Sequence, residues 1–390
     1  MYKKQQKRRF SGNRPRKNNF RSSKTLDPSN FVKKAQPVEE REFIAPIAFK
    51  DLKIHEELKS NILAKGYVNP TEIQSKTIDD LIEGRDIVGI ANTGTGKTGA
   101  FLIPIIHQLL NTDQKFQTLI VLPTRELALQ VEQEFKSLTK GMKLYSATLI
   151  GGTNVGKDIA KLRRMSHFII GTPGRILDMM NQRALKLTHF NTLVLDEFDR
   201  MLDMGFVKDV QKIASAMPNR NQTMLFSATI DDTQYTLIEA LVDKPLHISV
   251  SSGVTSSDAV EQAVVKLAGR DKFQVLTELI DNEDFKKVLI FAETKRVVNQ
   301  LNKKLNQSGF RSDMIHGDKS QNYRVNALQK FKNNKIQFLI ATDVAARGID
   351  ISDISHVINY QTPTSMDSYI HRIGRTGRAG KMGHAYTFID

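Results

Sequence analysis

Ala91-Asn92-Thr93-Gly94-Thr95-Gly96-Lys97-Thr98 stands between two apolar runs, 86–90 and 99–103. This order is typical of a strand, a glycine-rich loop and a helix that together hold nucleotide phosphates. Gly94 and Gly96 let the backbone turn so that successive N–H groups face phosphate oxygens, and the helix N-terminus adds positive potential. Lys97 would reach the β- and γ-phosphates, and the Thr98 hydroxyl would ligate Mg2+. The stretch predicts a nucleoside triphosphate site.

Apolar, strand-like runs alternate with amphipathic helical stretches beyond this loop. We expect strands at 118–122, 145–150, 167–170, 192–195 and 223–226. We expect helices at 126–138, 157–165, 174–181 and 207–216. Because parallel strands need a crossover, usually a helix, the alternation predicts a parallel sheet with helices on both faces.

The second half of the chain repeats the pattern, with strands expected at 287–292, 311–315, 337–341, 356–359 and 384–389. Two segments align at one offset, 119–125 with 289–295 and 168–172 with 338–342. This indicates two copies of one α/β fold, of which only the first has the phosphate loop. The small, polar stretch 251–258 indicates a linker. We therefore expect a first domain at 41–250 and a second at 259–390.

The N-terminal residues differ in composition from the rest. The net charge is +15, and residues 1–34 hold twelve Lys/Arg against a single acid, Asp27. With few apolar groups and no period, residues 1–40 are expected to be a disordered tail. Arginine and phenylalanine together suit the phosphates and stacked bases of single-stranded nucleic acid, although such a tail could also serve only solubility.

Other classes of protein are excluded or disfavoured by composition. The sequence has no cysteine, which excludes disulfides and cysteine-based metal sites. No apolar run approaches the ~20 residues that span a bilayer, and the basic N-terminus is unlike a signal peptide. We expect a monomer in the reducing cytoplasm.

Two further groups would complete a site for phosphoryl transfer, which needs a metal cation, a positioned water and neutralisation of charge. Asp196 and Glu197 follow an apolar strand, where Asp196 suits the metal and Glu197 suits activation of the attacking water. In the second half, cations spaced three residues apart would line one face of a helical turn: Arg372, Arg375 and Arg378. An arginine delivered across a cleft would stabilise γ-phosphate charge and make hydrolysis depend on closure.

From about Phe49 to the end, the chain resembles a DEAD-box RNA helicase. The resemblance rests on motifs in a fixed order: Phe49 with Gly66–Gln74, the phosphate loop, Pro123-Thr124-Arg125-Glu126-Leu127-Ala128, Gly151-Gly152, Thr172-Pro173-Gly174-Arg175, Asp196-Glu197-Phe198-Asp199, Ser227-Ala228-Thr229, Gln321-Asn322-Tyr323-Arg324, Ala341–Asp350 and Tyr369–Arg378. It implies two tandem RecA-like α/β domains, each a parallel sheet flanked by helices, and an ATP-dependent RNA helicase that uses Mg2+.

The resemblance also implies roles in the ATP site. Gln74 would read the adenine edge while Phe49 stacks on its face. Ser227 and Thr229 would bond Asp199 and His371 and so link the nucleotide to lobe closure. The remaining nucleotide-binding residues would be Thr71, Thr93, Gly94, Thr95, Gly96, Lys97, Thr98, Arg347, Asp350 and the arginine fingers Arg375 and Arg378.

A second implied set would hold the RNA backbone without reading bases, because hydroxyls, glycine amides and guanidiniums suit phosphate and sugar. The first domain would supply Pro123, Thr124, Arg125, Gly151, Gly152, Thr172 and Arg175. The second would supply Thr294, Gln321, Arg324, Thr342 and Gly348. The expected activity is RNA-stimulated ATP hydrolysis coupled to local, non-processive unwinding of short duplexes.

Two departures leave other functions open. Phe198 replaces the alanine of the family's acidic motif, which leaves the chemistry intact but could alter packing against Ser227–Thr229. The chain also ends after the strand expected at 384–389, where relatives usually add a helix. An ATP-gated RNA clamp or annealing chaperone with weak unwinding is therefore one alternative, and a DNA-directed motor is another.

Overall fold

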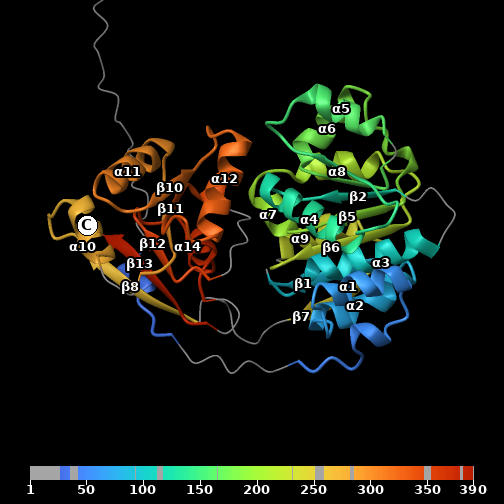
Figure 1. Cartoon of the computed structure of the whole chain (residues 1–390), viewed down its shortest axis with the longest axis horizontal. Helices are drawn as coiled ribbons and strands as arrows, with labels where there is room; N and C mark the ends of the chain where they lie inside the picture. Colours follow the sequence, from blue (N-terminus) through green and yellow to red (C-terminus); the bar gives the residue numbers. More distant parts are fainter. Residues whose placement is uncertain are drawn as a thin grey trace, which may run out of the picture.

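The computed structural model holds two α/β lobes (Figure 1). It describes residues 27–35, 43–92, 94–111, 117–164, 166–230, 232–250, 259–281, 285–346, 353–377 and 381–389. The linker predicted at 251–258 lies outside the described residues.

The first lobe is built on a seven-stranded parallel sheet of order β3-β4-β2-β5-β6-β1-β7. Its strands are β1 Ile87–Ala91, β2 Thr118–Val121, β3 Ser146–Leu149, β4 Phe168–Gly171, β5 Thr192–Leu195, β6 Gln222–Ser227 and β7 Leu246–Val250. Its helices are α1 Glu56–Ala64, α2 Glu72–Ile82, α3 Lys97–Asn111, α4 Arg125–Leu138, α5 Val155–Leu162, α6 Pro173–Asn181, α7 Phe198–Asp203, α8 Val207–Ser215 and α9 Asp232–Glu239, with 3-10 turns η2 Phe49–Asp51 and η3 Leu187–His189.

The second lobe is built on a six-stranded parallel sheet of order β10-β11-β9-β12-β13-β8. Its strands are β8 Val260–Lys266, β9 Val288–Phe291, β10 Ser312–Ile315, β11 Phe338–Ala341, β12 His356–Asn359 and β13 Gly383–Ile389. Its helices are α10 Lys272–Ile280, α11 Lys295–Gln307, α12 Gln321–Lys332, α13 Asp343–Ala346 and α14 Met366–Ile373. The expected pair of RecA-like domains is confirmed.

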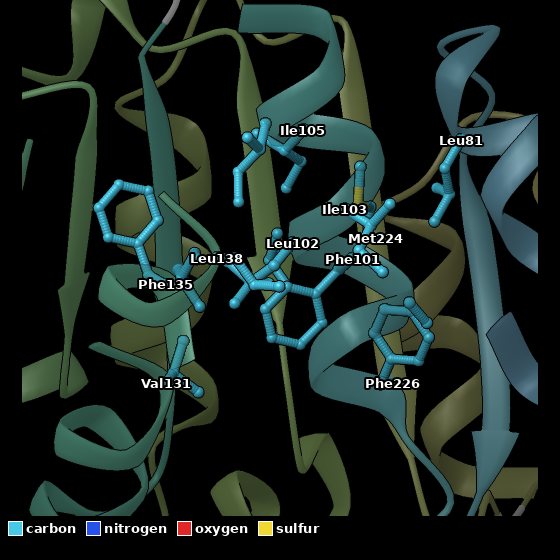
Figure 2. Packing of buried hydrophobic residues seen from close by; sticks show 14 of the residues in the cluster. Leu81, Phe101, Leu102, Ile103, Ile105, Val131, Phe135, Leu138, Met224 and Phe226 are labelled. Carbon is cyan, nitrogen blue, oxygen red and sulfur yellow. The ribbon is translucent and has the colours of Figure 1, made fainter. Parts of the chain in front are cut away.

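Each sheet has a hydrophobic core on both faces, because successive side chains of a strand point to opposite sides. In β5, Val194 joins the core beneath α3 and α4, whereas Leu193 and Leu195 join the core beneath α6 to α8. Figure 2 shows the first of these, where Phe101 of α3 and Phe135 of α4 lie among aliphatic side chains. Burial on both faces explains why these strands are continuous apolar runs in the sequence.

A short segment before the first lobe corrects one expectation. The sequence predicts a disordered tail through residue 40, but residues 27–35 are described, and Pro28–Phe31 forms the 3-10 turn η1. Asp27 caps the turn by accepting a hydrogen bond from the Ser29 amide at 2.9 Å. Phe31 is fully buried in the core of the second lobe. A single aromatic anchor has no periodicity, so the sequence pattern carried no signal for it.

Candidate nucleotide and nucleic-acid site

The phosphate loop lies at the carboxyl end of β1, as in other open parallel sheets. Gly94 and Gly96 have φ of 90° and 95°, a left-handed conformation that glycine adopts without steric strain. Lys97 is the first residue of α3, and its Nζ donates to the Ala91 carbonyl at 2.7 Å. The loop is therefore folded around its own lysine, and half-buried Thr98 follows it at the helix start.

Gln74 ties this loop to α2. Its side-chain oxygen accepts from the Thr71 amide at 3.0 Å, and its amide nitrogen donates to the Gly96 carbonyl at 2.9 Å. Thr71 and Gln74 together form a capping box at the start of α2. A β-carbon at Gly96 would lie 2.6 Å from Thr71 Oγ1 and 2.7 Å from Gln74 Nε2, so both residues pack against the loop itself.

Phe49 is expected from the sequence to stack on adenine, and this role stays a prediction. Its ring is only 1% exposed and belongs to the core of the first lobe. Tyr67 covers it, with ring centroids 6.4 Å apart. Hydrophobic burial explains this placement, since Phe49 follows an apolar stretch and packs among aliphatic side chains. As the structure stands, Phe49 presents no free face to a base.

The acidic motif follows β5 at the same edge of the sheet. Asp196 is 4% exposed and accepts a hydrogen bond from the Glu197 amide at 2.9 Å. Burial raises the pKa of Asp196 to about 6, and the nearby Lys97 ammonium opposes the rise. Glu197 has φ of 55°, a strained conformation for a residue with a side chain, of the kind that clusters at functional sites. The acids therefore lie beside the phosphate loop.

Arg200 holds Glu197 in this structure. The Arg200 Nη1 to Glu197 Oε2 distance is 2.5 Å, and both side chains are buried. Arg200 also lines a pocket between the lobes together with Asp203 of the first lobe and His371, Arg372 and Arg375 of the second. The sequence analysis missed Arg200, although its place three residues after Glu197 on one helical face was a usable signal.

Phe198 is part of the hydrophobic core of the first lobe. It is 1% exposed and packs into the core beneath α6 to α8. The next residue, Asp199, donates its amide to Ser227 Oγ at 3.2 Å, and Ser227 Oγ donates to the Thr229 carbonyl at 2.6 Å. The larger side chain is thus accommodated without breaking the contact between the acidic motif and Ser227.

The donor set for a metal fits Mg2+. Thr98 and Asp196 offer hard oxygen ligands, and Mg2+ often uses one or two protein oxygens with phosphates and waters. A buried Asp196 whose pKa is raised gains from a cation placed beside it. Among the described residues, no cluster of three His, Asp or Glu forms a metal site by itself.

In the second lobe, α14 carries the cations that face the first. Arg372 is bound internally, to Asp343 at 2.6 and 2.8 Å and over the Phe291 ring at 5.3 Å. Arg375 is 4% exposed and donates to the His371 carbonyl at 3.3 Å. Burial lowers the pKa of His371, and Arg200 across the lobe interface lowers it further. Arg372 is therefore a structural cation, and Arg375 is buried where the two lobes meet.

A second group of predicted residues surrounds Arg125 at the start of α4. Its guanidinium lies against the Gly151-Gly152 loop, where β-carbons would come within 2.9 and 2.4 Å of its nitrogens. Gly152 has φ of 80°, so a residue with a side chain would be strained there. The neighbouring helix starts are capped by threonines, Thr124 at α4 and Thr172 at α6, with Pro123 buried before them. These N-terminal ends suit phosphate oxygens.

Arg175 is engaged within the protein. Its guanidinium donates to the carbonyls of Ile150 and Thr153, at 3.0 and 2.5 Å, and lies near Asp178 and Asp158. The side chain is 8% exposed. The phosphate contact expected for Arg175 stays a prediction, and in the structure this residue shapes the loop that carries Gly151 and Gly152.

Glu126 joins the two lobes. Its Oε1 accepts a hydrogen bond from Gln321 Nε2 at 3.0 Å and forms an ion pair with Arg324 Nη2 at 3.0 Å, and all three side chains are buried. The sequence analysis grouped Gln321 and Arg324 with the RNA-binding residues but gave Glu126 no role. Glu126 is an acidic residue within a motif expected to bind RNA, and its negative charge indicated a cationic partner within the protein and not an RNA phosphate.

The remaining second-lobe residues lie at the corresponding edge of the second sheet. Thr294 caps α11 by accepting from the Val297 amide at 3.3 Å, and the Thr342 carbonyl caps α13. Several predicted residues lie outside the described part of the chain: Thr93, Arg347, Gly348, Asp350 and Arg378. Their expected roles stay predictions.

A phosphate loop and acidic strand end on one lobe, facing cations on a similar lobe, define a two-lobed nucleoside triphosphatase. Comparison with known families narrows this class. Residues 71–237 match the DEAD/DEAH box helicase model, and residues 271–380 match the helicase conserved C-terminal domain model.

Comparison with individual relatives supports the same family. The chain is 43% identical over 342 residues to the ATP-dependent RNA helicase CshA of Listeria monocytogenes, covering 88% of this chain and 66% of the relative. It is 41% identical to CshA of Bacillus licheniformis, covering 88% and 70%. It resembles the solved structure of S. cerevisiae Dbp5 bound to RNA and ADP BeF3, with TM-score 0.75, 31% identity and coverage of 88% and 89%. This chain belongs to the DEAD-box family of ATP-dependent RNA helicases.

The match does not extend over the whole length of every relative. The chain spans 66% of the Listeria protein and 65% of the Bacillus cereus one.

Within the described residues, none of the helices has both the length and the apolar character required to cross a bilayer.

Proposed function

We propose that this chain hydrolyses ATP in response to RNA and couples hydrolysis to local, non-processive separation or remodelling of short RNA duplexes and ribonucleoprotein. The observation that carries the proposal is the pocket between the lobes. Arg200 and Asp203, one turn after the acidic motif, line it with His371, Arg372 and Arg375 of the second lobe. Groups from both lobes thus meet beside the catalytic acids, as closure-dependent hydrolysis requires.

The residues of the first lobe supply the groups for hydrolysis. The loop amides and Lys97 would hold the β- and γ-phosphates, and Glu197, once released from Arg200, would orient the attacking water. Mg2+ held by Thr98 and Asp196 would neutralise phosphate charge. The acidic motif is used in its Asp196-Glu197-Phe198-Asp199 form, because Phe198 is buried away from this chemistry.

The second lobe would complete the site only when the lobes meet. Arg375 lines the pocket between the lobes, and from there its guanidinium would stabilise developing charge on the γ-phosphate. RNA would favour this state because its backbone would lie across both lobes, between the helix starts of the first lobe and Gln321 and Arg324 of the second. In this way RNA binding and hydrolysis share one conformational change.

Displacement of a short, labelled RNA duplex tests the proposal. The chain should release the strand with ATP and fail with ADP. Binding without release under both conditions would contradict it and favour the ATP-gated clamp. Competition between RNA and DNA of one sequence would show the 2′-hydroxyl preference expected of an RNA enzyme, and equal competition would favour the DNA-directed motor.

The basic tail would add non-specific affinity for RNA. Residues 1–26 hold ten Lys/Arg and no Asp or Glu. Deleting them should weaken RNA binding and reduce its salt dependence while basal ATP hydrolysis persists. If the dependence of RNA affinity on salt concentration is unchanged by the deletion, the tail serves solubility instead. The monomeric state and the cytoplasmic location expected from the sequence stay predictions.

A further inference from the structure

Residues 27–35 precede the first lobe in the chain but pack on the second. In Figure 1 the dark blue segment lies beside β8, on the lobe whose other elements are coloured orange and red. Phe31 lies in the core of this lobe with 0% exposure, among side chains of β8, β12 and α14. Neither matched family model includes this segment, since the first begins at residue 71.

The segment is attached by its backbone as well as by Phe31. The Lys33 amide donates to the Gln262 carbonyl at 3.1 Å, and the Gln262 amide donates to the Lys33 carbonyl at 2.8 Å. This antiparallel bridge lies on β8, the edge strand of the second sheet. Paired exchange of two hydrogen bonds fixes the register of the segment against the edge, so Phe31 has one position.

Phe31 contacts α14, the helix that holds His371 and leads into Arg375. Its ring meets Tyr369 of α14 edge to face, with centroids 4.7 Å apart and an interplanar angle of 63°. Tyr369 is 1% exposed, and its hydroxyl donates to Gln262 Oε1 at 2.9 Å. Gln262 is therefore held through its backbone by Lys33 and through its side chain by Tyr369. The Phe31 ring, the Tyr369 hydroxyl and the backbone bridge between Lys33 and Gln262 therefore form one connected unit.

The position of Tyr369 governs the position of its neighbours. His371 is two residues further along the same short helix, and Arg375 follows the helix C-cap, Gly374. In a helix of eight residues, movement of Tyr369 would displace both groups. Catalytic geometry is sensitive at this scale, since a displacement of about 1 Å can reduce turnover by about 100-fold.

We propose that Phe31 is a positioning residue for ATP hydrolysis, which acts through Tyr369 to hold His371 and Arg375 against the first lobe. The proposal rests on the proposed function, because it assigns Phe31 to the hydrolysis step of that reaction. Groups that act only on developing charge affect turnover more than substrate binding. Loss of Phe31 should therefore lower kcat and leave the KM for ATP and the RNA affinity nearly unchanged.

The test compares Phe31→Ala with Val32→Ala, a matched control because Val32 is the adjacent residue and is 63% exposed. At saturating RNA, Phe31→Ala should lose about tenfold in kcat with KM for ATP within about twofold. Val32→Ala should match the native chain, and Phe31→Leu, which refills most of the space, should recover most of the loss. Amide exchange across α14 should be faster in Phe31→Ala alone.

A second variant covers the case in which Phe31→Ala fails to fold. Lys33→Pro removes the backbone N–H that donates to the Gln262 carbonyl and so loosens the segment, while the Phe31 side chain is unchanged. It should lower kcat in the same direction. A variant that is less heat-stable but keeps native kcat well below its melting temperature would overturn the proposal and leave the segment a stabilising role. A native chain without RNA stimulation would refute the proposed function instead.

Discussion

The contact between the lobes at Glu126 leads to the most quantitative prediction. Replacement by glutamine keeps the size of the side chain and its acceptor oxygen but removes the charge that faces Arg324. One hydrogen bond, from Gln321, and one ion pair, with Arg324, end on one carboxylate oxygen, both 3.0 Å long and buried. We expect Glu126→Gln to weaken the joined state of the lobes.

The magnitude follows from the kind of bond that is lost. A hydrogen bond to a charged group contributes about 1.5–3 kcal/mol, and the bond from Gln321 to a neutral amide persists at about 1 kcal/mol. Loss of the charged component therefore disfavours closure by about 1.5–3 kcal/mol. At about 1.4 kcal/mol per factor of ten, this corresponds to roughly 10- to 150-fold in the closure equilibrium.

Closure can be followed by energy transfer between dyes on the two lobes. The native sequence has no cysteine, so cysteines introduced at exposed Glu83 and Lys303 label single sites. With a non-hydrolysable ATP analogue, the RNA concentration at half-maximal closure should rise by roughly 10- to 150-fold in Glu126→Gln.

Glu132→Gln is the matched control, because Glu132 lies on the same helix and pairs with Lys136 of that helix at the surface. Such surface pairs contribute well under 1 kcal/mol, so this variant should close like the native chain. Equal midpoints for Glu126→Gln and Glu132→Gln would refute the reasoning, because the buried bridge would then contribute nothing to closure.

Three more predictions follow from single positions. Phe198→Ala restores the alanine usual in the family but leaves a cavity beneath α6 to α8, so the unfolding free energy should fall by about 3–5 kcal/mol in denaturant titration while turnover per folded molecule persists. Gly94→Ala and Gly96→Ala are equally strained at positive φ, but only at Gly96 does the β-carbon meet Thr71 and Gln74, so Gly96→Ala should lose more ATP affinity by calorimetry; equal losses would contradict this. The pKa of His371 is lowered by burial, by Arg200 and by Arg375, against the opposing effect of Asp203 and Asp199. As the pH falls, the unfolded state therefore binds a proton on His371 before the folded state does. The contribution of His371 to the free energy of unfolding is fully present above the unfolded pKa of about 6.5 and is lost as the pH falls toward the folded-state pKa. His371→Gln should flatten this decline in urea midpoints measured from pH 8 to 5.

The central strands were predictable because burial on both faces leaves them continuously apolar. β5 illustrates this, since the expected range 192–195 agrees with Thr192–Leu195. The edge strands β7 and β8 were missed. In Leu246–Val250 only the last side chain is fully buried, so the apolar signal is diluted by exposed polar positions. Edge strands carry less hydrophobic signal than strands that are covered on both faces.

The site was predictable where a short motif requires a particular backbone conformation, as the glycines of the phosphate loop do. It was less predictable where roles depend on tertiary contacts. Arg175 and Arg372 look like exposed cations in the sequence, yet carboxylates and carbonyls of their own lobe surround them. Glu126 contacts Gln321, 195 residues away, and Phe31 contacts Tyr369 in the other half of the chain, and no local pattern encodes such partners.

The central claim is that RNA and ATP act on one site shared by two lobes. Steady-state ATP hydrolysis with and without single-stranded RNA, for the native chain and for Glu197→Gln, tests it most directly. The account predicts strong stimulation by RNA in the native chain and a loss of about 100-fold or more in the variant, which should still bind RNA. Turnover that is equal with and without RNA would contradict coupling between the lobes, and native turnover in Glu197→Gln would contradict the assigned chemistry.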